Sequence, residues 1–151
     1  MRYLLFILRV VLGGVFIFAA YMKLRDPWLV FAMEIDAYQL LPSWAVLTAA
    51  RTLPWAELLL GVGLVAGIGL RWAAAGATVM MAVFFSVMSW TFMRGLQIDC
   101  GCFGPGERIG PKTLTLDGTL LLLCAAAWIL SGRNAKRVER AQAQLRPAVL
   151  Q

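Results

Sequence analysis

The chain has 151 residues, of which 61% are hydrophobic and only 15% charged, and its formal net charge is +6. The mean hydropathy is +0.76. A soluble domain is typically about 45–50% apolar, so this composition excludes an ordinary soluble domain as well as a disordered chain. Histidine is absent, which excludes Ser-His-Asp and Cys-His catalysis and histidine-ligated zinc or haem. Three cysteines are too few for a disulfide-scaffold domain.

Four apolar stretches are long enough to cross a hydrocarbon core of about 30 Å, which takes about 20 residues of helix. They cover residues 3–22, 53–70, 72–93 and 114–130. The sequence therefore predicts an all-α integral membrane protein, with a bundle of four transmembrane helices in residues 1–132. We interpret the first stretch as a spanning helix, because its apolar run exceeds the ~7–15 residues of a signal peptide and no small-residue cleavage site follows.

Residues 26–43, between the first two spans, are too polar to cross a membrane. Phe31, Ile35 and Tyr38 recur at helical spacing, whereas Glu34 and Asp36 fall outside this stripe. The pattern predicts a short amphipathic helix on the periplasmic surface of the membrane, ended by Pro42.

Basic residues set the expected orientation. With four spans both termini lie on one side of the membrane, and Glu139 is the only acid on that side. Its eight basic residues are Arg2, Arg9, Arg71, Arg133, Lys136, Arg137, Arg140 and Arg146. By the positive-inside rule we expect both termini in the cytoplasm and the protein in a bacterial inner membrane. Residues 133–151 are then a basic cytoplasmic tail on the anionic lipid surface, rather than a nucleic-acid-binding segment.

Charged residues of the four spans gather at the expected outer end of the bundle. Because buried charges are costly in a bilayer unless they pair, this supporting polar cluster is either part of a functional site or an ion-pair network that holds the helices together. The cluster consists of Lys23, Arg51, Glu57, Arg94, Asp99 and Asp117.

A cysteine-containing segment is expected next to this polar cluster, where Asp99 is followed by Cys100-Gly101-Cys102-Phe103-Gly104. A disulfide between Cys100 and Cys102 would be a weak staple, because closing three residues removes only about 1.6 kcal/mol of chain entropy. Its small ring would be strained and therefore readily exchanged. We favour a redox-active, catalytic pair over a static disulfide or a metal clip. Cys124 lies about 10 Å from Asp117 along the fourth span and is expected to be a buried, inert thiol.

The order of several short motifs resembles the MauE branch of the DoxX-like membrane proteins. The motifs are Arg9-x-x-Leu12-Gly13-x-x-Phe16, Lys23, Asp26-Pro27, Tyr38-x-Leu40-Leu41-Pro42, Leu53-Pro54-Trp55-x-Glu57-Leu58-x-x-Gly61, Arg71 and the Cys100-Gly101-Cys102-Phe103-Gly104 loop. The resemblance implies a four-helix membrane protein that acts with a periplasmic thioredoxin-like partner in the maturation of methylamine dehydrogenase, whose small subunit is rich in disulfides. It also implies that Cys100 and Cys102 are the redox pair.

Three functions remain open at this point. In the leading one, the protein is a thiol–disulfide oxidoreductase component that exchanges disulfides through Cys100 and Cys102 and passes electrons to a quinone near Glu57, Arg51 and Arg94. This exchange would serve the maturation of methylamine dehydrogenase or of another disulfide-containing periplasmic protein. The first alternative is binding or transfer of a soft metal such as Cu(I) by the thiolates of Cys100 and Cys102. The second is a non-catalytic, DoxX-like subunit of a respiratory complex.

Overall fold

The computed structural model describes residues 2–96, 98–99 and 108–145, with side-chain contacts for residues 3–96, 98–99 and 108–133. The described chain forms five helices and one isolated antiparallel bridge, between Asp99 and Arg108. The helices are α1 (Arg2–Arg25), α2 (Trp28–Ala37), α3 (Ser43–Ala66), α4 (Leu70–Met93) and α5 (Pro111–Leu145).

Four of these helices are long and apolar enough to cross a membrane: α1, α3, α4 and the first part of α5. Large apolar side chains cover their outer surfaces; Leu59, Trp72 and Leu122, for example, are 74%, 82% and 72% exposed. Apolar surface on this scale is unfavourable in water and suits contact with lipid. The predicted fold class, an all-α protein with four transmembrane helices, is therefore confirmed.

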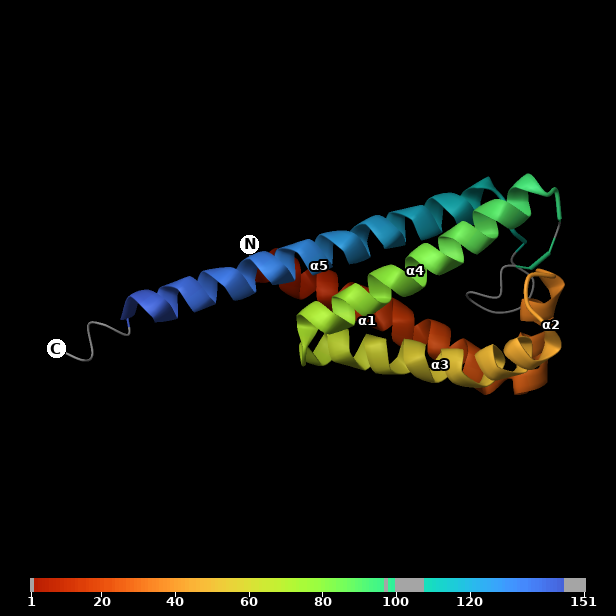
Figure 1. The fold of residues 1–151 in the computed structure, drawn as a ribbon, viewed down its shortest axis with the longest axis horizontal. Coiled ribbons are helices and arrows are strands. Elements are labelled where there is room, and N and C mark those ends of the chain that lie inside the picture. Colours follow the sequence, from red (N-terminus) through yellow and green to blue (C-terminus); the bar gives the residue numbers. More distant parts are fainter. Residues whose placement is uncertain (1, 97, 100–107, 146–151) are drawn as a thin grey trace.

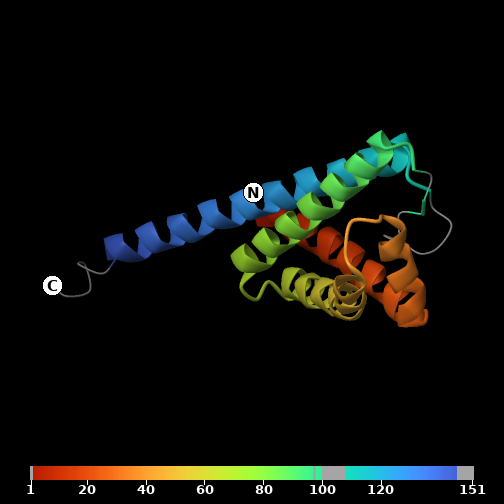
Figure 2. The ribbon, with the colours of Figure 1, turned by 45° about the vertical axis from the view of Figure 1, so that its right-hand side comes forward.

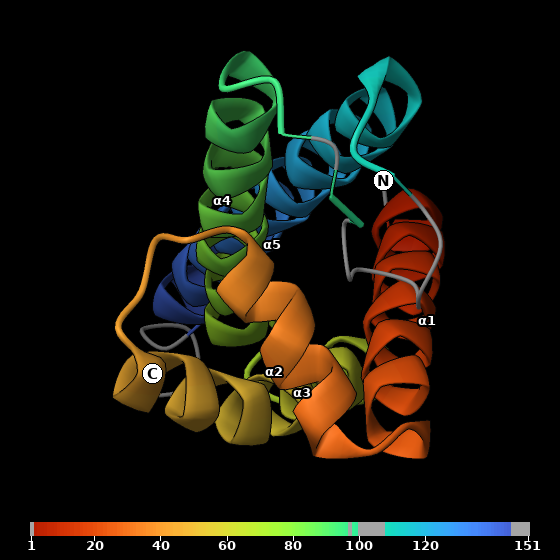
Figure 3. The same ribbon diagram turned by 90° about the vertical axis from the view of Figure 1, so that its right-hand side faces the viewer.

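The helices alternate in direction along the bundle, and α5 extends well beyond the others (Figures 1 and 2). The most extensive packing is between α1 and α3 and between α4 and α5, with α2 packed on α3. At one end of the bundle, α2 lies near the last turns of α1 and α4 and the first turns of α3 and α5 (Figures 1 and 3). We call this the α2 end; the turn between α3 and α4 lies at the opposite end.

The second span differs from its predicted bounds of residues 53–70. The helix α3 begins at Ser43, directly after Pro42, and continues through Pro54. An interior proline removes one backbone hydrogen bond without stopping a membrane helix whose neighbours support it. At the other end, Gly67 and Gly69 adopt the left-handed conformation, with φ of 74° and 56°. Glycine adopts this conformation without strain, so the helix ends at Ala66 and α4 starts at Leu70.

A short helix, α2, lies between the first two spans; it follows Pro27 and ends at Ala37, before the predicted end at Pro42. Its position on the periplasmic surface of the membrane stays a prediction. The basic segment that we expected to be separate from residue 133 onward instead continues α5 as one helix to Leu145. No proline interrupts the sequence between Pro111 and Leu145, so nothing in the backbone chemistry forces a break at the membrane boundary. Attachment of the tail to a lipid surface stays a prediction.

Two glycines bring α1 and α3 into close backbone contact. A Cβ atom added at Gly13 would lie 2.7 Å from the carbonyl oxygen of Gly61, and one added at Gly61 would lie 2.9 Å from the carbonyl oxygen of Gly13. Small residues allow this approach between helices in lipid. The two helices that carry Lys23 and Glu57 are therefore held at a short separation.

Candidate functional site

A buried ion pair joins α1 to α3 near the α2 end. The Lys23 ammonium donates to both carboxylate oxygens of Glu57, with Nζ 2.9 Å from Oε1 and 3.0 Å from Oε2. Both side chains are 4% exposed. The phenyl rings of Phe31 and Phe84 also face the ammonium, with centroids 5.4 and 6.0 Å from Nζ. Pairing and cation–π contact offset the cost of removing the two charges from water.

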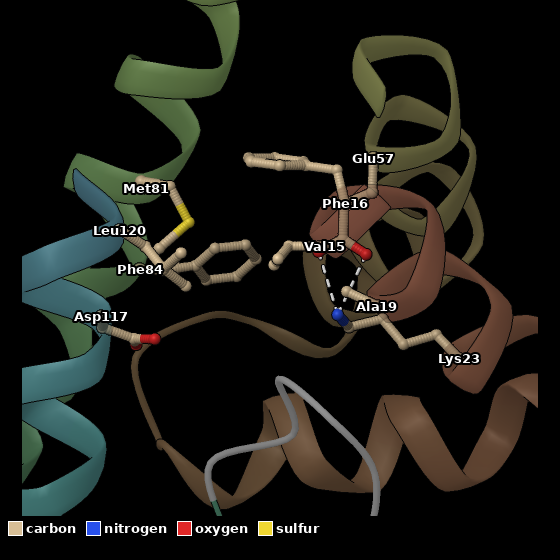
Figure 4. A pocket seen from close by; sticks show the side chains of 9 residues that line it. All are labelled: Val15, Phe16, Ala19, Lys23, Glu57, Met81, Phe84, Asp117 and Leu120. Carbon is tan, nitrogen blue, oxygen red and sulfur yellow. Dashed lines mark hydrogen bonds and ion pairs between the residues drawn. The ribbon is translucent and has the colours of Figure 1, made fainter. Parts of the chain in front are cut away.

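Asp117 of α5 faces the same small cavity as this pair. The cavity has a volume of about 30 Å³ and is lined by Lys23, Glu57, Asp117 and apolar side chains of α1, α4 and α5. Figure 4 shows Asp117 on the opposite side of the cavity from Lys23 and Glu57, with Phe84 and Met81 beside it. Asp117 is 3% exposed. Three ionisable groups from three helices thus surround a space large enough for about one or two water molecules.

Arg51 and Arg94, which we expected in the same polar cluster, lie elsewhere. The Arg51 guanidinium lies 4.4 Å from the ring centroid of Trp28 and is exposed. Arg94 caps the end of α4 and is also exposed. Neither residue lines the small cavity or the larger cavity that Lys23 also lines. The structure therefore brings together Lys23, Glu57 and Asp117, and separates the two arginines from them.

Asp99 lies at the α2 end, at the isolated bridge with Arg108. Next to it, the Ile109 N–H donates to the carbonyl oxygen of Ile98 at 3.0 Å. Cys100 and Cys102 follow Asp99 in the chain and lie outside the described residues. Cys124 is fully buried in the main hydrophobic core, as predicted, and is a free thiol.

A second, larger cavity, which was not predicted from the sequence, lies beside the ion pair. It has a volume of about 280 Å³, and Lys23, Glu34 and Tyr38 are the polar or charged side chains that line it. Burial raises the pKa of the Glu34 carboxyl above its ordinary value of 4.5; the Lys23 ammonium opposes this rise, and the Asp99 and Asp26 carboxylates add to it. Glu34 had been expected on the polar face of the amphipathic helix, and this was wrong. Glu34 is spaced three residues from Phe31 and four from Tyr38, and this spacing indicates that the three side chains share one face of the helix.

The described residues contain no group of three or more cysteine, aspartate or glutamate side chains that could hold a metal ion. A site made by Cys100 and Cys102 is not tested by this observation, because both lie outside the described residues.

Comparison with protein families gives a match over most of the chain. The family model described as methylamine utilisation protein MauE matches residues 1–131. The chain belongs to the MauE family. The match includes the four spans, Lys23, Glu57, Asp117 and the Cys100-Gly101-Cys102 segment. The wider resemblance to DoxX-like proteins stays a prediction.

Two curated relatives of this MauE-family chain are similar to it over most of its length. The methylamine utilization protein MauE of Paracoccus denitrificans is 33% identical over 132 residues, which are 87% of this chain and 70% of the relative. The protein of the same name from Methylorubrum extorquens is 35% identical over 118 residues, which are 78% of this chain and 55% of the relative. The chain thus spans only about half the length of the second relative. No solved structure matches the chain.

Proposed function

We propose that this MauE-family protein takes part in methylamine utilisation as a membrane thiol–disulfide relay. Cys100 and Cys102 are the exchanging pair, and a periplasmic thioredoxin-like protein is the partner. In the exchange, a thiolate of one protein attacks the disulfide of the other and a mixed disulfide forms. The second thiol then resolves it, so that one protein ends as the disulfide and the other as the dithiol.

The observation that carries the proposal is the position of the residues next to Cys100. The bridge between Asp99 and Arg108 ties the two ends of the intervening segment together at the α2 end. Lys23, whose ammonium pairs with Glu57, also faces the Phe31 ring of α2. An ionisable cluster within the membrane supports the proposal, because oxidation of two thiols also releases two protons that such groups can accept.

The distribution of charge supports an inner-membrane location with both termini in the cytoplasm. At the end opposite α2, the Arg9 guanidinium packs against Gly67, and the Arg71 side chain lies next to Gly132. Asp26, Glu34 and Asp36 lie at or beside α2. The basic end of a membrane bundle faces the cytoplasm, so the α2 end and the cysteine pair face the periplasm in this proposal.

The exchange step is tested by trapping the mixed disulfide in cells. Cys100→Ser and Cys102→Ser leave one thiol that can attack a partner and none that can resolve the product. We expect at least one of these variants to accumulate a higher-mass adduct that disappears on reduction, and the Cys100→Ser/Cys102→Ser double variant to form none. Cys124→Ala is the matched control and retains the wild-type pattern. Absence of any adduct in both single variants contradicts the proposed exchange.

The role in methylamine utilisation is tested separately by complementation. A bacterium that requires its own MauE for growth on methylamine is given either the wild-type chain or the double cysteine variant. We expect only the wild-type chain to restore growth. Restoration by the variant would contradict the role of the cysteines, and failure of the wild-type chain, if it is present in the membrane, would contradict the methylamine role.

A further inference from the structure

The larger cavity lies between α2, α3 and α4 and touches the buried ion pair. Lys23 and Phe84 line both this cavity and the small one that contains Glu57 and Asp117, so they form the wall between the two. At about 280 Å³, the cavity is close to the lower limit of roughly 300–1,000 Å³ for small-molecule sites. This size suits a single substituted ring.

The cavity is continuous with the lipid-facing surface of the bundle. Val83 lines it and is 57% exposed, and Leu40 and Leu41 line it and are 43% and 48% exposed. These side chains are partly exposed, so in a membrane their exposed atoms would contact lipid. A ligand with an apolar chain could therefore enter from the bilayer and leave its chain in lipid.

The polar groups of the cavity favour a neutral ligand. The positive charge of Lys23 is already balanced by Glu57 at 2.9 Å, and the Glu34 carboxyl faces the cavity from α2. An anionic head group would lie near two carboxyl groups with only one ammonium between them. Lys23 and Tyr38 carry hydrogen-bond donors, so a neutral group with acceptor oxygens, such as a ring carbonyl, matches the lining.

The cavity also adjoins the chain segments that flank the cysteine pair. Met88 and Tyr38 line the cavity and belong to a hydrophobic cluster with Ile98 and Ile109. Ile98 immediately precedes Asp99, which is followed by Cys100. The described residues next to the cysteine segment thus pack on the wall of the cavity.

We propose that this cavity binds a neutral, lipid-soluble quinone-class ring, which accepts electrons from Cys100 and Cys102. The role as acceptor rests on the proposed function. In the balanced step, two thiols lose two electrons and two protons and become a disulfide, and the quinone gains both and becomes a quinol. The expected position near Glu57, Arg51 and Arg94 is thereby replaced by one next to Lys23, Glu34 and Tyr38.

Binding is tested with purified protein in phosphatidylcholine nanodiscs, with decylubiquinone as the probe. The amount of probe retained is measured across a concentration range, and the retention by empty nanodiscs is subtracted. Decylbenzene, which has the same chain but no carbonyl groups, is the control ligand. We expect saturable binding of decylubiquinone and binding of decylbenzene that is at least about tenfold weaker. Equal binding of the two ligands, or no saturable binding of decylubiquinone, overturns the proposal.

A cavity-filling variant locates the site. Ala49→Phe adds a ring at a position that lines the cavity, whereas Leu47→Phe adds one at an exposed position of the same helix outside it. We expect decylubiquinone binding to weaken at least about tenfold in the first variant and to stay unchanged in the second. Unchanged binding in a folded Ala49→Phe protein overturns the assignment; if that variant does not fold, the comparison of the two ligands on the unmodified protein decides.

The cysteine double variant separates this inference from the proposed function. We expect Cys100→Ser/Cys102→Ser to bind decylubiquinone as the wild type does. Only the wild-type protein with Cys100 and Cys102 reduced to thiols is expected to convert decylubiquinone to the quinol. Binding without quinol formation by the wild type contradicts the electron-transfer role. Mixed-disulfide trapping that succeeds while decylubiquinone fails to bind overturns the cavity assignment and leaves the exchange step standing.

Discussion

Lys23 and Glu57 place two opposite charges between α1 and α3, where each side chain is 4% exposed. Each charge is the direct ion-pair partner of the other, and Asp117 is the further ionisable side chain that lines the small cavity. Removal of one partner leaves an uncompensated buried charge, which typically costs about 3–5 kcal/mol, whereas replacement of both by apolar side chains is close to neutral.

We therefore expect Lys23→Met and Glu57→Leu each to lower the free energy of unfolding by about 3–5 kcal/mol, and the double variant to recover most of the loss. Unfolding in detergent, followed by circular dichroism, measures both. Arg51→Met removes an exposed charge and is expected to cost at most about 1 kcal/mol. If the single variants lower the free energy of unfolding by no more than Arg51→Met does, the burial of the ion pair is contradicted.

Glu34 gives a prediction about pH. Burial raises the pKa of its carboxyl above 4.5, despite the opposing Lys23 charge, and Asp99 and Asp26 raise it further. A raised folded-state pKa contributes stability that is present below the unfolded pKa and is lost as pH rises through the folded value.

Glu34→Gln is accordingly expected to be more stable than the wild type at pH 7. The difference is expected to shrink as pH falls through the raised folded-state pKa and to be lost below about 4.5. Thermal unfolding across this range in detergent is the measurement. Asp36→Asn, at an exposed position of the same helix, controls for the loss of one negative charge. A Gln variant that is less stable than the wild type at neutral pH would show that the Lys23 charge outweighs the cost of burial.

At the residue scale, the sequence predicts the level of each charged residue along its helix, but not the side of the helix axis to which its side chain points. The rise of about 1.5 Å per residue indicates that Lys23, Glu57 and Asp117 lie at similar levels of their helices. It does not determine the rotation of each helix about its axis, which decides that Glu57 faces Lys23 while Arg51 lies on Trp28. The cavity that Glu34 lines depends on how α2 packs on α3. It was not predictable, because the sequence does not determine how the helices are rotated against each other.

At the scale of helices, the close approach of α1 and α3 depends on Gly13 and Gly61. A Cβ added at Gly13 would lie 2.5 Å from Cγ2 of Val65 and 2.7 Å from a backbone oxygen, whereas one added at Gly14 would meet no atom within 4 Å. A side chain at Gly13 must push the helices apart, and overpacking of this kind costs about 1–3 kcal/mol.

Gly13→Ala is expected to destabilise the protein by about 1–3 kcal/mol, and Gly14→Ala to be neutral or stabilising by up to about 1 kcal/mol, because alanine favours helix. The two variants differ by one position on the same helix, so the comparison isolates the helix contact. Denaturant unfolding of both in the same detergent measures the difference. Equal stability of the two variants would mean that α1 and α3 do not touch at Gly13.

Helix number and order were predictable because apolar length is a strong signal, whereas some boundaries were not. The sequence suggested that the second span begins near Pro54, but the helix already starts at Ser43. Polar residues such as Thr48 and Thr52 remain within this helix because their hydroxyls donate to the carbonyls of Trp44 and Thr48. Local hydrogen bonds of this kind satisfy side chains that a hydropathy count treats as unfavourable.

At the scale of the whole molecule, the bundle has two chemically different ends. One contains α2, the Lys23–Glu57 pair and the bridge before Cys100; the other contains the turn between α3 and α4 with Arg9 and Arg71 beside it. The proposed relay requires the first end to face the periplasm, where disulfides persist, and the second to face the cytoplasm.

The most direct test of this account labels the cysteines of the protein in intact cells with a membrane-impermeant maleimide, before and after mild reduction. We predict that Cys100 and Cys102 react from outside, and that the reactive fraction increases on reduction. Cys124, which is fully buried, serves as the internal negative control. Labelling of Cys100 and Cys102 only after the membrane has been permeabilised would contradict the account, as would a pair that no reductant opens.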